Sequence, residues 1–432
     1  MQEHLTGAKS FSGTLRVPGD KSISHRALMF GAMARGQSAV RGLASGLDVR
    51  STAECLRALG VEIKAAGPET VLIRGAGPKG LREPGSVLDA GNSGTTMRLL
   101  SGILAGQPFQ TTITGDKYLR QRPMRRIIEP LESMGAQVLS AGGGFPPLSI
   151  RGGSLTGINY RLPVASAQVK SCVLLAGLYA RGRTTVIETV ASRDHTERML
   201  PLFGVEVKRE GLAASVEGGA ALVAVDLEVP GDPSSAAFFA AAAALVPGGE
   251  VRLEGLCLNP TRAAFYDLLE AMGAKLEKEN QRTQAGEPVA DLIVRHSPLK
   301  AAQVDRTVLP SLIDEVPVLA VLATQAEGLT RILDAGELRL KETDRIAAIA
   351  GNLTRMGARV REMAEGLEIE GPCTLKASSL DSFGDHRIAM AMSVAALAAE
   401  GETVIENSGC AEISFPGFYP TLRKLAGLYQ TA

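Results

Sequence analysis

One short pattern recurs five times along this chain of 432 residues and limits the folds that it can adopt. The pattern is Leu, two variable residues, one of Leu, Met or Phe, then Gly followed by Ala or Val, as in CLRALGVEI. Its glycines are Gly60, Gly135, Gly204, Gly273 and Gly357. Each copy predicts an amphipathic helix that ends at a left-handed glycine and is followed by a strand. Because successive glycines lie 69 to 84 residues apart, the pattern predicts repeating units of about 70 residues.

A second series of helices lies half a unit earlier. Six apolar segments each run to a glycine and are followed by alternating residues, which are typical of half-exposed strands. These segments begin at His25, Thr95, Val169, Ala236, Val316 and Arg387. Several of them are apolar on almost every side, which predicts an α/β fold with the helices inside and the sheets outside.

The stretch VPGD occurs twice, three units apart, and leads into a helix each time. The simplest architecture therefore has two domains of three units each, and the chain crosses between them at Gly19 and Gly231. The predicted domains are residues 18–231, and residues 1–17 together with 232–432. Leucine-rich helices that end at glycine also occur in α/β proteins without repeats, but the matched VPGD stretches favour a repeat.

Composition argues against several kinds of partner. The 46 basic residues balance the 46 acidic ones without a basic run, so we expect neither a nucleic-acid nor a membrane partner. The five cysteines form no CxxC pair, which argues against disulfides and against a structural metal site. We therefore expect a cytoplasmic protein, in line with an N-terminus that has no apolar signal segment. The most apolar stretch, 236–246, is too short to span a membrane, which takes about 20 residues.

Polar groups that packing does not require gather at the predicted helix starts. They are Lys21, Ser22 and Arg26; Asn92, Ser93, Gly94 and Thr95; Ser166, Ala167 and Gln168; Asp314 and Glu315; and Asp385, His386 and Arg387. If the units are related by approximate threefold symmetry, equivalent helix N-termini meet at one end of each domain. Helix N-termini combined with Lys and Arg bind anions. The sequence therefore predicts a small ligand with several negative charges.

Each of these motifs also has a purely structural interpretation. KSISHR reads as a helix start capped by Ser22 or Ser24, and GNSGTT reads as a cap and a turn. Asp314 and Glu315 would stabilise a helix start through the helix dipole, without any catalytic role.

The histidines and one charged segment have similar alternatives. His25, His195 and His386 lack the spacing of metal ligands, so a surface or capping position is the default for each. KETDR, at 341–345, reads as a solvated charged face of a helix. Each alternative is reasonable by itself, whereas all the motifs together require a common ligand.

Taken in order, the motifs resemble those of the enolpyruvyl transferases, and in particular the branch that acts on shikimate 3-phosphate. The matching segments are PGDKSISHR, GNSGTTMR, RQRPM, SAQVKS, SRDHTE, LIDEVPVLA, LKETDR, GDHRIAM and SFP. They run along almost the whole chain. The resemblance implies two domains, each made of three βαβαββ units, with the active site in the cleft between them.

The resemblance also implies a reaction. The enolpyruvyl group of phosphoenolpyruvate is transferred to the 5-hydroxyl of shikimate 3-phosphate, and phosphate is released, on the route to chorismate and aromatic amino acids. No metal and no organic cofactor is expected, and the partners are the two small-molecule substrates of a monomer. The shikimate 3-phosphate contacts implied by motif are Lys21, Ser22, Arg26, Ser166, Ala167, Gln168, Arg193, Asp314 and Lys341. The implied phosphoenolpyruvate contacts are Lys21, Gly94, Arg122, Gln168, Glu342, Arg345 and Arg387.

This chemistry requires one acid and one base, because a neutral hydroxyl attacks C2 of phosphoenolpyruvate while C3 is protonated. We assign Asp314 to the substrate hydroxyl, and Glu342 with Lys21 to C3 and the departing phosphate. One position departs from the family pattern, since Ile413 stands where many members have lysine. In the family, Gly94 lies against the part of the site where the herbicide glyphosate also binds.

Other functions fit part of the same residue set, although the nucleotide-binding signatures of RNA 3′-phosphate cyclases, which share the repeat architecture distantly, are not visible. The sister transferase acting on UDP-N-acetylglucosamine typically has a cysteine ahead of its RP motif and a KN pair near the start, whereas this chain has YLRQRPM and Lys21-Ser22. A non-catalytic protein that binds phosphate esters would use the same cations, but it would not need Asp314 and Glu342.

Overall fold

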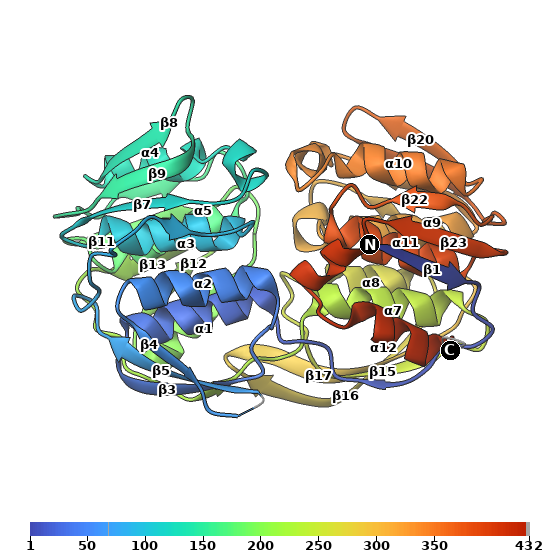
Figure 1. The fold of residues 1–432 in the computed structure, drawn as a ribbon, viewed down its shortest axis with the longest axis horizontal. Coiled ribbons are helices and arrows are strands. Elements are labelled where there is room, and N and C mark those ends of the chain that lie inside the picture. Colours follow the sequence, from blue (N-terminus) through green and yellow to red (C-terminus); the bar gives the residue numbers. More distant parts are fainter. Residues whose placement is uncertain (68, 429–432) are drawn as a thin grey trace. The chain divides into compact units, whose positions relative to one another are not determined.

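The computed structural model describes residues 1–67 and 69–428, and these divide into two compact units (Figure 1). The central unit consists of Gly19–Pro230 and the hairpin turn Gln284–Glu287. The terminal unit consists of Met1–Pro18, Gly231–Thr283 and the described chain from Pro288 onward. The predicted domain bounds did not include the hairpin turn, because hydrophobic periodicity does not indicate where the tip of a hairpin packs.

The central unit holds the first described helices and most of the short strands. In chain order its elements are α1 (Lys21–Met33), β3 (Arg35–Arg41), α2 (Leu47–Ala58), β4 (Glu62–Ala65), β5 (Thr70–Ala76), β6 (Leu88–Asp89), α3 (Gly94–Ala105), β7 (Gln110–Thr114), η1 (Leu119–Gln121), α4 (Arg125–Ser133), β8 (Gln137–Ala141), β9 (Phe145–Arg151), β10 (Asn159–Arg161), α5 (Ala167–Gly177), β11 (Arg183–Ile187), α6 (His195–Met199), η2 (Leu200–Phe203), β12 (Val207–Glu210), β13 (Ala213–Glu217) and β14 (Leu227–Glu228).

The terminal unit contains the first two strands and everything after α7, apart from the tip of the β16–β17 hairpin. Its elements are β1 (Gln2–Thr6), β2 (Ser12–Leu15), α7 (Pro233–Leu245), β15 (Glu250–Cys257), α8 (Ala264–Ala271), β16 (Lys275–Gln284), β17 (Glu287–Arg295), β18 (Gln303–Val304), η3 (Leu309–Ser311), α9 (Val316–Gln325), β19 (Gly328–Ile332), η4 (Gly336–Leu340), α10 (Arg345–Arg355), β20 (Arg359–Met363), β21 (Gly366–Gly371), β22 (Ser379–Asp381), α11 (His386–Leu397), β23 (Glu402–Glu406), η5 (Ser408–Ile413) and α12 (Phe418–Ala426).

The sheets repeat one pairing scheme. In the sheet β6-β7-β9-β8, β6 runs parallel to β7, and β9 pairs antiparallel with both β7 and β8. The described chain forms the same arrangement in β14-β3-β5-β4, β10-β11-β13-β12 and β18-β19-β21-β20. A parallel pair requires a crossover, which a helix provides. The predicted α/β class with repeated units is confirmed.

Three of the described sheets are completed by strands from distant parts of the chain, and in one of them β2 pairs in parallel with β15. β1, at the start of the chain, pairs antiparallel with β23 in the sheet β22-β23-β1, where other units place a hairpin. β14 comes from the end of the central segment and pairs in parallel with β3. Because β1 and β2 pair within the terminal unit but precede the central segment, the chain must cross between the units more than once.

The helices lie inside each unit and the sheets outside (Figure 1). In α7, every residue from Pro233 to Ala244 is buried, whereas in β9 buried and exposed residues alternate. The many alanines of α7 permit close packing against α9 and α11, and Phe238 packs its ring edge-on against Phe418 with centroids 6.0 Å apart. This confirms the predicted placement of the apolar helices.

The repeated glycines confirm the predicted helix ends, with φ between 80° and 107° at all five positions. One copy differs from the prediction. Before Gly204 the helix α6 ends at Met199 and continues as the 3-10 turn η2, because Pro201 at the start of that turn cannot donate an α-helical hydrogen bond.

The described residues also bear on membranes and metals. Within the ranges described above, no helix combines the length and apolar character needed to cross a membrane. The same residues include no group of three or more His, Cys, Asp or Glu side chains that could hold a metal ion.

Candidate active site

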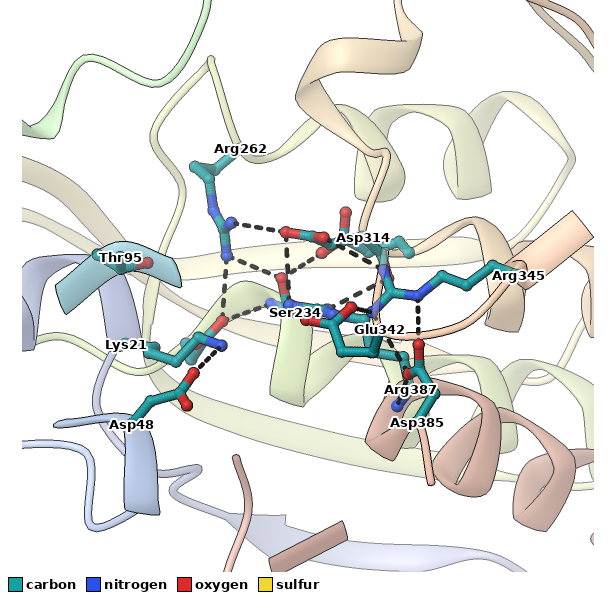
Figure 2. Close-up of polar contacts among 12 residues, drawn as sticks. Lys21, Asp48, Thr95, Ser234, Arg262, Asp314, Glu342, Arg345, Asp385 and Arg387 are labelled. Carbon is teal, nitrogen blue, oxygen red and sulfur yellow. Dashed lines mark hydrogen bonds and ion pairs between the residues drawn. The ribbon is translucent and has the colours of Figure 1, made fainter. Parts of the chain in front are cut away.

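Lys21 opens helix α1 in the central unit. The helix is capped by Asp20, whose carboxylate accepts the amide of Ile23 at 2.8 Å, so the predicted cap at Ser22 or Ser24 is wrong. The ammonium of Lys21 lies 2.9 Å from Oδ2 of Asp48, with 22% of the lysine side chain exposed (Figure 2). A helix start disfavours a cation, and Asp48 on α2 offsets that cost.

Arg26 lies one turn further along α1 and is almost fully buried. Its Nε donates to Thr196 at 2.8 Å, its Nη2 donates to Ser171 at 2.6 Å, and its Nη1 donates to the carbonyl of Ser22 at 2.9 Å. Burial lowers the pKa of Arg26 to about 10, which leaves it charged at neutral pH. Arg26 therefore ties together the segments that carry the predicted shikimate 3-phosphate contacts.

The start of α5 carries Ser166, Ala167 and Gln168. Ser166 is the N-cap, and the side chain of Gln168 is held in both directions. Its Nε2 donates to Thr95 Oγ1 at 3.0 Å, and its Oε1 accepts from Nη1 of Arg98 at 2.5 Å. The amide orientation of Gln168 is thus fixed by helix α3.

Helix α3 begins at Gly94, directly after its N-cap Ser93. A β-carbon at Gly94 would lie 2.9 Å from Nη1 of Arg98 and 3.4 Å from Nη1 of Arg122. Arg122 in turn donates to Oδ1 of Asn92 at 2.9 Å. Glycine at position 94 therefore lets the guanidinium group of Arg98 approach the helix start more closely than a side chain would allow.

A buried charge cluster that sequence analysis missed lies behind the predicted shikimate 3-phosphate contacts. The ammonium of Lys170 on α5 is 2.7 Å from Glu188 and 2.7 Å from Glu197, and these side chains are 2%, 7% and 3% exposed. Lys170 also donates to the carbonyl of Ser192 at 3.4 Å. The segment that carries Arg193 is thereby fastened to α5. A lysine inside the apolar run VKSCVLL was the available signal.

The three histidines are buried, so the expectation of surface or capping positions is wrong. His25 and His195 are 0% exposed and His386 is 3% exposed. Nδ1 of His195 lies 2.7 Å from Oε1 of Glu287, in the hairpin turn that belongs to the central unit. A contact between residues so far apart in sequence leaves no local pattern that could predict it.

In the terminal unit, Arg345 lies at the centre of a network of acids (Figure 2). Its Nε donates to Asp385 at 2.8 Å, its Nη2 donates to Glu342 at 2.7 Å, and its Nη1 lies 3.6 Å from Oδ1 of Asp314. Although burial alone lowers the pKa of Arg345, the surrounding carboxylates outweigh it and raise that pKa. Asp385 also caps α11 and so fixes Arg387 at the helix start.

Asp314 lies near three guanidinium groups. Besides Arg345, Nη2 of Arg387 is 3.4 Å and Nη1 of Arg262 is 3.9 Å from its Oδ2. Arg262 was not predicted, and its only signal was an arginine in the turn NPTR after a strand. Glu315 is the N-cap of α9 but makes no capping hydrogen bond with its side chain, which instead accepts from Ser234. These acids are therefore positioned by side-chain partners rather than used simply to cap a helix.

The segment KETDR is not the charged helix face of the alternative interpretation, because α10 begins only at Arg345 with Asp344 as its N-cap. Lys341 and Glu342 precede the helix and are partly buried. Removal from water lowers the pKa of Lys341, and the carboxylate of Asp314 opposes that shift. Ile413 ends the 3-10 helix η5.

Comparisons with known proteins bear directly on this arrangement. A family model described as EPSP synthase (3-phosphoshikimate 1-carboxyvinyltransferase) matches residues 5–422. The chain belongs to the EPSP synthase family. The prediction of an enolpyruvyl transferase of this branch is therefore confirmed.

Individual relatives support the same assignment. The chain is 53% identical to the 3-phosphoshikimate 1-carboxyvinyltransferase of Synechococcus sp. strain JA-3-3Ab, over 98% of this chain and 96% of that protein. It is 52% identical to the protein of the same name from Brevibacillus brevis, over 97% of this chain and 98% of that protein. The structure is similar to that of an EPSP synthase from Acinetobacter baumannii, with a TM-score of 0.89, 45% identity and 98% of each chain covered.

Proposed function

We propose that this chain transfers the enolpyruvyl group of phosphoenolpyruvate to the 5-hydroxyl of shikimate 3-phosphate and releases phosphate. The observation that carries the proposal is the carboxylate of Asp314 among three guanidinium groups, 3.4 to 3.9 Å away. Cations at this distance hold the carboxylate in place and also attract an anionic substrate to it. Membership of the EPSP synthase family supports the choice of substrates.

The reaction divides into an addition and an elimination. In the addition, the substrate oxygen bonds to C2 of phosphoenolpyruvate, its proton passes to Asp314, and a proton is delivered to C3. In the elimination, C3 loses a proton, the double bond is restored, and the bond from C2 to the phosphate oxygen breaks. Glu342 is assigned to the proton at C3, with Lys21 at the departing phosphate. Arg345 holds Glu342 through a 2.7 Å hydrogen bond, which restricts the direction of its carboxylate.

The proposed substrate contacts come from both units. Lys21, Ser166, Gln168 and Arg193 belong to the central unit, together with Ser22, Arg26, Ala167, Gly94 and Arg122. Asp314, Lys341, Glu342, Arg345 and Arg387 belong to the terminal unit. We infer that both sets act on the same pair of substrates, because the phosphates and carboxylates of the two substrates need more cations than either set supplies alone.

The test is phosphate release from the two substrates by the parent and by Asp314→Asn. The amide keeps the shape of the carboxylate but cannot accept the proton, so turnover should fall by several orders of magnitude while shikimate 3-phosphate still binds. Asp267→Asn is the matched control, since Asp267 is a terminal-unit aspartate whose side chain is 64% exposed. Binding of both ligands without phosphate release by the parent would favour a non-catalytic phosphate-ester binder instead. Near-normal turnover of Asp314→Asn would remove the base assignment.

A further inference from the structure

A chain of buried hydrogen bonds runs from helix α1 through α2 to the start of α3 in the central unit. Nδ1 of His25 on α1 lies 2.7 Å from Oγ1 of Thr52 on α2, which lies 2.7 Å from Oγ1 of Thr96 on α3. Thr96 donates to Oγ of Ser93, the N-cap of α3, at 2.7 Å. All four residues are 0% exposed. We call these four residues the His25 relay.

The direction of each hydrogen bond in the relay follows from the number of hydrogens that its groups can donate. The one hydroxyl hydrogen of Thr96 has two acceptors, Oγ of Ser93 at 2.7 Å and, more distantly, the carbonyl of Asp48 at 3.4 Å, so in either case Thr52 must donate to Thr96. Thr52 then has no hydrogen left for His25, and Nδ1–H of the imidazole must be the donor to Thr52. Every donor therefore points toward the start of α3. Nε2 of His25 is left as the unprotonated nitrogen, with no hydrogen-bond partner among the described residues.

The imidazole stays neutral in this environment. Burial lowers the pKa of His25 to about 3. Asp48 on α2 and Asp20 before α1 oppose that shift, while Lys21 and Arg26 on α1 add to it. A neutral ring with one fixed tautomer can act as a rigid donor over the working pH range.

We propose that His25 and Thr52 are positioning residues that set the first turn of α3 for phosphoenolpyruvate. The proposal rests on the proposed function, in which Gly94 in that turn is a phosphoenolpyruvate contact. Ser93 receives both the amide of Thr96 at 3.1 Å and the last hydroxyl of the relay, so the relay ends on the cap itself. Burying a hydroxyl group costs desolvation free energy, which alanine or valine at the same position would avoid. Hydrogen bonds compensate for that free energy only when the hydroxyl groups keep the positions and directions described above.

The turn is sensitive to small shifts because functional side chains pack directly against it. Thr95 accepts the amide of Gln168 at 3.0 Å, and a β-carbon at Gly94 would lie only 2.9 Å from the guanidinium group of Arg98. Even a small displacement of this turn would therefore move Gln168, a proposed phosphoenolpyruvate contact, together with Gly94. Of the proposed shikimate 3-phosphate contacts, Ser166 and Arg193 lie on other segments. Arg26, by contrast, follows His25 on α1 and is held by its own hydrogen bonds to Thr196 and Ser171.

The kinetic test is Thr52→Val, which keeps the volume of the side chain and removes one hydroxyl. The KM for phosphoenolpyruvate should rise about fivefold, the equivalent of one neutral hydrogen bond, with a smaller change in the KM for shikimate 3-phosphate. Thr52→Ser should restore the parent value. The matched control is Thr184→Val, since Thr184 is a buried threonine of the same unit whose hydroxyl has no partner among the described residues. Equal changes in both KM values, no change in either, or no rescue by serine would overturn the proposal.

A spectroscopic test does not depend on turnover. The chain has five histidines, so protein labelled with nitrogen-15 at histidine gives few ring signals, and loss of a signal in His25→Gln assigns His25. We expect a neutral ring protonated on Nδ1 from about pH 5 to 8, and a changed Nδ1 signal in Thr52→Val. A ring protonated on Nε2, or one that titrates in this range, would contradict the relay. If the parent shows no turnover, the proposed function fails, while this measurement still decides whether the relay exists.

Discussion

Lys170 and Glu197 form a buried ion pair in the central unit, with 2.7 Å between Nζ and Oε1. Glu188 makes a second contact of the same length, so one ammonium serves two carboxylates that have almost no access to water. Arg26 helps to offset the additional negative charge. Burial lowers the pKa of Arg26 to about 10, and the nearby carboxylate of Glu197 opposes that shift. The contacts of Lys170 with Glu188 and Glu197 thus hold the segment that carries Arg193 beside α5.

Lys170→Met should destabilise the protein strongly, because it leaves two carboxylates buried without their cation. Loss of one partner from a buried pair costs about 3 to 5 kcal/mol of the free energy of unfolding. Chemical denaturation should therefore show a lower midpoint for Lys170→Met. Lys208→Met is the control, since Lys208 pairs with Glu210 on the surface and should leave the midpoint unchanged. Similar midpoints for the two variants would mean that the buried cluster contributes no stability.

His25 should make stability depend on pH in the acid range. Its pKa falls from 6.5 when solvated to about 3 in the folded protein, so between these values the unfolded chain binds one more proton. The free energy of unfolding should therefore decrease as pH falls from about 6.5, by about 1.4 kcal/mol per pH unit from this group. The contribution of His25 to stability is thus complete above pH 6.5 and is progressively lost below it.

The measurement is urea denaturation of the parent and of His25→Gln at several pH values between about 4 and 7. The difference in unfolding free energy between the two proteins should shrink as the pH falls, because glutamine does not titrate. His4→Gln serves as the control, since the side chain of His4 is 51% exposed. A difference that stays constant with pH would show that His25 is not held neutral.

Arg262 should be required for turnover although sequence analysis missed it. Its Nη2 donates to Ser234 at 2.8 Å and lies 3.1 Å from Asp232, while its Nη1 faces Asp314. Arg262→Met would remove a cation beside the proposed base and leave buried acceptors unsatisfied, so kcat should fall by about tenfold or more. The comparison is Arg331→Met, which removes an arginine that is 47% exposed and pairs with Glu368 on the surface of the same unit. Equal kcat values for the two variants would count against a role for Arg262.

Local patterns in the sequence were sufficient for the repeats but not for the contacts between them. The glycine that ends each helix acts within its own turn, so Gly60 and Gly273 could be predicted from a few neighbours. The pairing of β1 with β23 joins opposite ends of the chain, and no local periodicity encodes it.

Side-chain burial was the other limit of sequence reasoning. His25 and Lys170 have no neighbours in sequence that indicate burial. Their buried partners lie further along the chain: Thr52 is 27 positions after His25, and Glu188 is 18 positions after Lys170. The cap of α1 was misassigned because Asp20 and Ser22 both fit a cap, and backbone geometry chose the aspartate. The sequence predicted helix starts at or beside Lys21, Gly94 and Arg387, where the structure has them, whereas Arg262 belongs to no matched motif and emerged only from three-dimensional contacts.

Gly94→Ala should discriminate between phosphoenolpyruvate and glyphosate, which in this family binds at the same part of the site. A methyl group at position 94 would lie 2.9 Å from Nη1 of Arg98, which must shift, and 3.4 Å from Nη1 of Arg122, which is ordinary contact. Overpacking of this kind costs about 1 to 3 kcal/mol, or roughly one to two powers of ten in affinity. Glyphosate is the longer ligand and has less room to adjust. Its inhibition constant should therefore rise more than the KM for phosphoenolpyruvate, in steady-state kinetics with phosphoenolpyruvate as the varied substrate.

The control for this prediction is Gly351→Ala, because a β-carbon at that helical position in the terminal unit meets no atom within 4 Å. This variant should leave both constants unchanged. The shift of Arg98 adds a second expectation: because Arg98 donates to Gln168, a proposed phosphoenolpyruvate contact, the KM of Gly94→Ala should rise measurably above the parent value. Equal increases in the two constants, or a parent enzyme that glyphosate does not inhibit, would show that space at position 94 is not what separates the two ligands.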